Sequence, residues 1–153
     1  MSLLREVVDA VDPSLAPYAV AQPPRGEWEE RLPDDRDRAF VLEAVYEGFL
    51  LHYRESRLFD GMDSDLRLLA GDSLYALGLE RLAQTGDIAA VAELADLISL
   101  CAQAEARGRS ELVPELWEAT LAALSPAGGE GARAALGSRL AQADGFPLEQ
   151  PGS

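Results

Sequence analysis

The 153-residue chain contains 25 Ala and 25 Leu but only 12 residues of Val, Ile and Thr together, and its formal net charge is −14. This length fits one domain, and an apolar content that favours helix over strand predicts an all-α fold. The chain contains no lysine, which excludes chemistry that needs one, such as a Walker loop or a Schiff base. Its 13 basic residues are all Arg and form no cluster, so we expect no nucleic-acid partner.

The first 33 residues predict a short helix followed by a proline-rich arm. Residues 3–11 form the predicted helix, and its apolar face consists of Leu4, Val7, Val8 and Val11. Five prolines between positions 13 and 33 exclude a long helix there and predict an extended arm. Tyr18 and Trp28 are the residues that we expect to attach this arm to the rest of the protein.

Residues 34–144 are predicted to form a helical bundle, and with the N-terminal helix the chain has about five to six helices in an antiparallel arrangement. The first helix of the bundle runs over 35–54, with acidic residues in its first turn and an expected core side made of Phe40, Leu42, Val45, Phe49 and His52. The next runs over 65–84 after a cap at Asp63 or Ser64. Because this second helix is apolar almost all round, we expect it to be the central, most buried one.

The second half of the bundle begins after a break at Gly86 and Asp87. A helix over 88–107 is predicted to turn inward the residues Ile88, Val91, Leu94, Ala95, Ile98 and Cys101. A helix over 110–124 tolerates Pro114 in its first turn, and a weak helix over 132–143 precedes a loose tail, 145–153. The short links between helices predict antiparallel neighbours.

Cysteine usage and hydropathy indicate a cytoplasmic location. Cys101 is the single cysteine, so no intramolecular disulfide is possible, and the N-terminus does not have the pattern of a secretion signal. Charged residues interrupt the apolar stretches well before the roughly 18–20 residues that a membrane span requires.

Two helix residues are the main candidates for chemistry. His52 is the only histidine, so a His-rich metal site is excluded, and we expect no metal, no cofactor and no catalytic residue. Asp72 has mainly apolar neighbours one turn away on either side, which predicts a buried carboxylate paired with Arg54, His52 or Tyr75. Its role is either a structural anchor or a working group of a ligand or partner site.

Residues 69–76, Leu-Ala-Gly-Asp-Ser-Leu-Tyr-Ala, resemble the helix of trans-isoprenyl diphosphate synthases that reads Leu-x-Gly-Asp-x-Leu. Upstream, Leu50-Leu51-His52 is similar to the start of that family's first aspartate-rich motif, Leu-Leu-His-Asp-Asp. Where the family has the two aspartates that bind magnesium, this chain has Tyr53 and Arg54. A second aspartate-rich motif is missing, and the chain is about half as long as those enzymes.

This combination resembles the noncatalytic small subunit, component I, of two-component heptaprenyl diphosphate synthases. The resemblance implies a helical accessory subunit that pairs with a catalytic partner and helps to set product length. Two alternatives stay open: a helical interaction or scaffold module that associates with itself or another protein, and a bundle that binds a small ligand or acts as an enzyme. For all three, the candidate ligand- or partner-binding residues are His52, Arg54, Asp72 and Tyr75.

Overall fold

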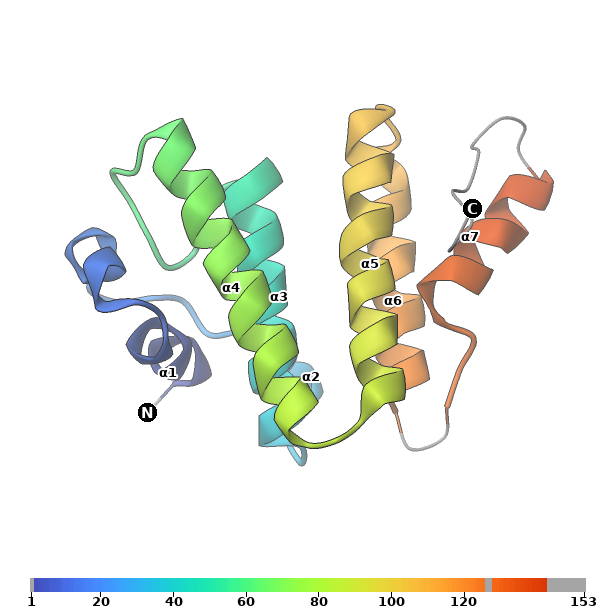
Figure 1. Cartoon of the computed structure of the whole chain (residues 1–153), viewed down its shortest axis with the longest axis horizontal. Helices are drawn as coiled ribbons and strands as arrows, with labels where there is room; N and C mark the ends of the chain where they lie inside the picture. Colours follow the sequence, from blue (N-terminus) through green and yellow to red (C-terminus); the bar gives the residue numbers. More distant parts are fainter. Residues whose placement is uncertain (1, 126–127, 143–153) are drawn as a thin grey trace. The chain divides into compact units, whose positions relative to one another are not determined.

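The protein is described by a computed structural model that covers residues 2–125 and 128–142 (Figure 1). The predicted all-α class is confirmed: the only β-type pairing in these residues is a single bridge between Ala19 and Phe59. The α-helices are α1 (Leu3–Ala10), α2 (Glu27–Arg31), α3 (Arg36–Tyr53), α4 (Ser64–Gln84), α5 (Ile88–Ala106), α6 (Val113–Leu124) and α7 (Gly131–Gln142). The described residues also contain two 3₁₀ helices, η1 (Pro13–Tyr18) and η2 (Ser110–Leu112).

The chain forms two compact units, and the predicted bundle, 34–144, extends over both of them. The first unit is Met1–Asp87, and the second begins at Ile88. The break falls where the sequence predicts one: Gly86 has a φ of +80°, a left-handed conformation that glycine adopts without steric cost.

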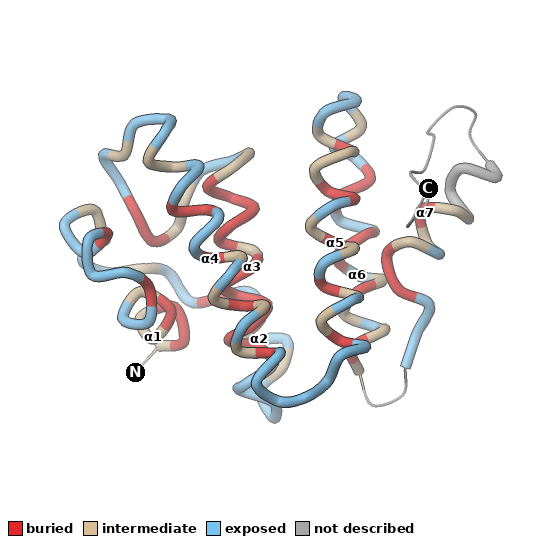
Figure 2. Tube along the Cα trace, in the orientation of Figure 1, coloured by how far each residue is buried: buried red, intermediate tan, exposed pale blue. Residues whose placement is uncertain are grey.

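Helix α3 is the centre of the first unit. Helices α1, α2 and α4 all pack against it, and it is buried on almost every side (Figure 2). The apolar residues that it buries are Ala39, Phe40, Val41, Leu42, Ala44, Val45, Phe49, Leu50 and Leu51. Asp35 caps its first turn by accepting a hydrogen bond from the Arg38 amide at 3.1 Å.

The prediction that the 65–84 helix is the most buried one is wrong. Helix α4 buries only Ala70, Gly71, Leu74, Gly78 and Leu82, all of them on the side that packs against α3. Leu68 and Leu69 are 47% and 64% exposed. Within the first unit, the apolar residues of α4 are therefore divided between a buried side and an exposed side.

The proline-rich arm is not simply extended, as predicted, because it contains η1 and α2. Pro13 starts η1 directly after Asp12. The Ser14 amide donates a hydrogen bond to the Asp12 carboxylate at 2.8 Å, and this bond lowers the pKa of Asp12 below its usual value. Trp28, on α2, is buried and meets Tyr46 of α3 edge to face. Trp28 thus attaches the arm, as expected from the sequence.

Helices α5, α6 and α7 form the second unit. The predicted inner face of α5 is partly wrong, because Ile88 is 72% exposed and Ala95 is exposed as well. The residues that α5 buries are Ala90, Leu94, Leu97, Leu100, Cys101 and Ala104. The helix is apolar on two sides, and the side that contacts α6 and α7 lies about a third of a turn away from the predicted one.

The predicted C-terminal tail, 145–153, lies outside the described residues. Over the ranges that are described, no helix combines the length and the apolar character needed to cross a bilayer.

Candidate functional site

Three of the four predicted site residues meet where the C-terminal end of α3 crosses α4. His52 Nε2 and Asp72 Oδ1 are 3.0 Å apart, within hydrogen-bond distance. The His52 ring also stacks on the Tyr75 ring, with centroids 5.2 Å apart and planes inclined by 7°. Of the partners predicted for Asp72, the structure places His52 against its carboxylate.

Two glycines allow α3 and α4 to approach closely at this point. A Cβ atom on Gly71 would lie 2.5 Å from His52 Cδ2, and one on Gly48 would lie 2.6 Å from Tyr75 Cδ1. Real Cβ atoms do not come this close to other heavy atoms, so both positions need a residue without a side chain. The Gly71-Asp72 pair in the sequence therefore has a local reason: the glycine makes room for the imidazole that the aspartate contacts.

The prediction that Asp72 is buried is wrong. Its side chain is 69% exposed, whereas that of His52 is 15% exposed. Only one of its carboxylate oxygens, Oδ1, contacts the imidazole. Its apolar neighbours in sequence misled the prediction, because two of them, Leu68 and Leu69, are exposed themselves.

Arg54, the fourth predicted residue, forms the C-terminal cap of α3. Its guanidinium lies over the Phe49 ring at 5.2 Å, and its Nη1 donates to the Tyr53 carbonyl at 2.9 Å. Tyr53 packs against Phe49 as well, with ring centroids 5.2 Å apart. Both positions where the resembled family has magnesium-binding aspartates are thus packed on one aromatic ring.

Asp72 belongs to a small exposed surface on the outer side of α4. We call this surface the outer patch, and it consists of Asp65, Leu68, Leu69 and Asp72. All four residues are exposed. The basic residue within this stretch, Arg67, points toward α3, where its Nη2 donates to the Leu50 carbonyl at 3.1 Å and to the Arg54 carbonyl. The outer patch therefore combines two large apolar side chains with two carboxylates.

The same unit contains a buried ionic network that was not predicted from the sequence. Glu43 and Glu47 of α3 are completely buried, and Arg57 lies between them. Arg57 Nη1 donates to Glu43 Oε1 at 2.9 Å, and its Nε donates to Glu47 Oε1 at 3.0 Å. Glu43 Oε2 also accepts hydrogen bonds from the Trp28 and Glu29 amides at the start of α2, while Ser56 Oγ donates to Glu47.

This network connects α3 to α2 and to the loop after α3. Burial raises the pKa of Glu43, and the positive charge of Arg57 opposes that rise. A signal for it was present in the sequence: two glutamates four residues apart interrupt the apolar run of α3. Such a pair either faces solvent or shares a cation, and the cation came from a loop residue whose position the helical pattern does not predict.

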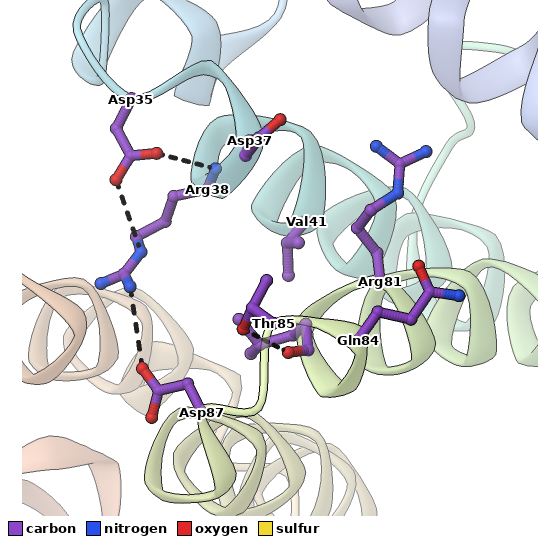
Figure 3. A pocket seen from close by; sticks show the side chains of 9 residues that line it. Asp35, Asp37, Arg38, Val41, Arg81, Gln84, Thr85 and Asp87 are labelled. Atoms are coloured by element: carbon purple, nitrogen blue, oxygen red, sulfur yellow. Dashed lines mark hydrogen bonds and ion pairs between the residues drawn. The ribbon is translucent and has the colours of Figure 1, made fainter.

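A cavity of about 520 Å³ lies at the opposite end of the α3–α4 pair (Figure 3). Its apolar lining includes Val41 and Leu82, and its charged lining includes Asp37 and Arg81. Arg38 crosses one side, with its Nε 3.6 Å from Asp35 Oδ2 and its Nη2 4.0 Å from Asp87 Oδ2. The cavity contains none of the predicted site residues.

No protein-family model matches the chain, and neither the curated proteins nor the solved structures contain a match. Within the described part of the chain, no three His, Cys, Asp or Glu side chains are grouped to bind a metal ion. The candidate site consists of a partly covered imidazole, an exposed carboxylate within hydrogen-bond distance of it, and two exposed leucines nearby.

Proposed function

We propose that this protein is noncatalytic and acts by associating with another protein through the outer patch of α4. The observation that carries the proposal is the exposure of Leu68 and Leu69, at 47% and 64%. These leucines are adjacent on a helix whose other side is well packed. Covering two such side chains with a partner stabilises a complex by the transfer of apolar surface out of water.

Contacts with α3 on both sides of the outer patch hold this part of α4 in place. Gly71 brings α4 close to α3, and the His52 ring, which stacks on Tyr75, lies within hydrogen-bond distance of Asp72. At the other end, Arg67 ties α4 to two carbonyls near the end of α3. A surface that is ordered before binding loses less conformational entropy in the complex, which favours its use as an interface.

More specifically, we propose that the chain is an accessory subunit of a prenyl diphosphate synthase. It is supported by the position of the two segments that resemble this family, because His52 of the first lies 3.0 Å from Asp72 of the second. Tyr53 and Arg54 offer a phenol and a guanidinium in place of carboxylates, and neither binds magnesium well. In this form of the proposal, a separate catalytic subunit supplies the metal site.

Affinity capture tests both forms. The tagged full-length chain and a Leu68→Ser/Leu69→Ser variant are incubated in lysate of the source organism, and bound proteins are identified by mass spectrometry. We expect the wild type to retain one protein in stoichiometric amount and the variant to lose it. Recovery of a catalytic prenyl diphosphate synthase subunit supports the specific form, whereas identical recovery by both chains contradicts the general one.

A further inference from the structure

The two carboxylates of the outer patch frame its leucines along the helix. Asp65 precedes Leu68 and Leu69 by about one turn, and Asp72 follows them by about one turn. Residues seven apart lie on nearly the same side of a helix, about 10.5 Å apart along its axis. The order along the exposed side of α4 is therefore negative, apolar, negative.

Nearby groups leave much of this negative charge accessible. Asp72 is 69% exposed, and its contact with His52 uses one oxygen, Oδ1. Asp65 is exposed in the first turn of α4. Arg67, between the two, directs its guanidinium to the carbonyls of Leu50 and Arg54 rather than outward. A partner that covers the leucines thus meets carboxylates on both sides of them.

We propose that the outer patch binds an amphipathic helical segment of a partner protein, with apolar residues at its centre and two basic residues about seven positions apart. This inference rests on the proposed function and defines the chemistry of the partner. The apolar residues cover Leu68 and Leu69, while the basic residues meet Asp65 and Asp72. A second copy of this chain fits less well, since each copy has 27 acidic and 13 basic side chains, and the copies repel each other.

A helical peptide library displayed on phage tests this proposal without knowledge of the partner. The library is selected on the wild-type protein, on a Leu68→Ser/Leu69→Ser variant and on an Asp65→Asn/Asp72→Asn variant. We expect the wild type to enrich peptides with two Arg or Lys residues about seven positions apart and Leu, Ile or Phe between them. The leucine variant should not enrich these peptides, and the aspartate variant should enrich apolar peptides without the basic pair.

The affinity of the best peptide gives a quantitative check. We expect binding by the aspartate variant to be weaker by about tenfold, and binding by the wild type to weaken as salt is raised. Enrichment of acidic or uncharged peptides, no enrichment at all, or equal affinity for wild type and aspartate variant would overturn the proposal. If lysate capture still depends on the leucines, only this inference fails; if capture is independent of them, the proposed function fails as well.

Discussion

Asp72 holds the His52 imidazole at 3.0 Å while most of its own side chain remains in solvent. The contact therefore joins a largely covered ring on α3 to an exposed carboxylate on α4. A hydrogen bond to an exposed carboxylate contributes little to stability, because water competes for the carboxylate. The exposed part of Asp72 belongs to the outer patch, which we propose binds a partner protein.

Replacing Asp72 should consequently have a small effect on folding. We expect Asp72→Asn to change the free energy of unfolding by no more than about 1 kcal/mol, as measured by urea denaturation. A loss of about 3 kcal/mol or more would mean that the carboxylate is buried in solution, contrary to its position in the structure.

Gly71 should be far less tolerant than its neighbour. We expect Gly71→Ala to destabilise the protein by about 1–3 kcal/mol, because the new Cβ would lie 2.5 Å from the His52 ring. Gly137→Ala is a matched control within α7, where a Cβ meets no atom within 4 Å, and it should be neutral or slightly stabilising.

A second substitution separates this clash from other causes. A Gly71→Ala/His52→Ala double variant has no ring for the new Cβ to meet. It should therefore lose less stability than the sum of the losses in the two single variants. Thermal unfolding followed by circular dichroism provides the comparison. Strict additivity would show that the ring does not limit the space at position 71.

The buried network predicts a large effect at Arg57. Arg57→Met leaves the carboxylates of Glu43 and Glu47 buried without their cation, and we expect a loss of about 3–5 kcal/mol in urea unfolding. Arg25→Met, which removes an exposed pair with Glu30, should cost no more than about 0.5 kcal/mol. Equal effects of the two substitutions would contradict the arrangement of the network.

The pKa of Glu43 predicts a pH dependence of stability. Because burial raises this pKa above the ordinary value of 4.5, the folded state binds the proton more tightly than the unfolded chain. The contribution of Glu43 is therefore complete below about pH 4.5 and is lost as the pH rises through the raised pKa. Glu43→Gln cannot ionise and removes this contribution.

The measurement compares unfolding free energies between pH 4.5 and pH 8. Relative to Glu43→Gln, the wild type should lose stability as the pH increases over this range. The exposed Glu55→Gln substitution serves as a control and should run parallel to the wild type. A wild type that gains stability with pH relative to Glu43→Gln would reverse the sign and exclude a raised pKa.

The positions of the helices outside the proline-rich arm could be predicted from the sequence, because local signals define them. Asp35 and Asp63 cap α3 and α4, and Gly86 marks the break after α4. The neighbours of each helix could not be predicted in the same way. An apolar helix such as α4 has enough apolar surface to pack against several neighbours, but its sequence pattern does not predict how many elements contact it in the fold.

The candidate site shows the same limit. The partner of Asp72 could be narrowed to Arg54, His52 or Tyr75, since only a few groups are available to a mid-helix carboxylate, and the structure places His52 there. Its exposure could not, because the exposure depends on what covers Leu68 and Leu69. Glu43 and Glu47 present the opposite case: they resemble surface residues in sequence, and only the position of Arg57 in the following loop allows them to be buried.

Native mass spectrometry of the untagged protein, purified under mild conditions from its source, tests whether the chain associates through α4. We expect a complex heavier than a single chain for the wild type and the mass of a single chain for the Leu68→Ser/Leu69→Ser variant. Both leucines are exposed, so the variant should fold with nearly unchanged stability, which urea unfolding verifies. A wild type that is strictly monomeric at micromolar concentration, or a complex that persists in the variant, would contradict association through α4.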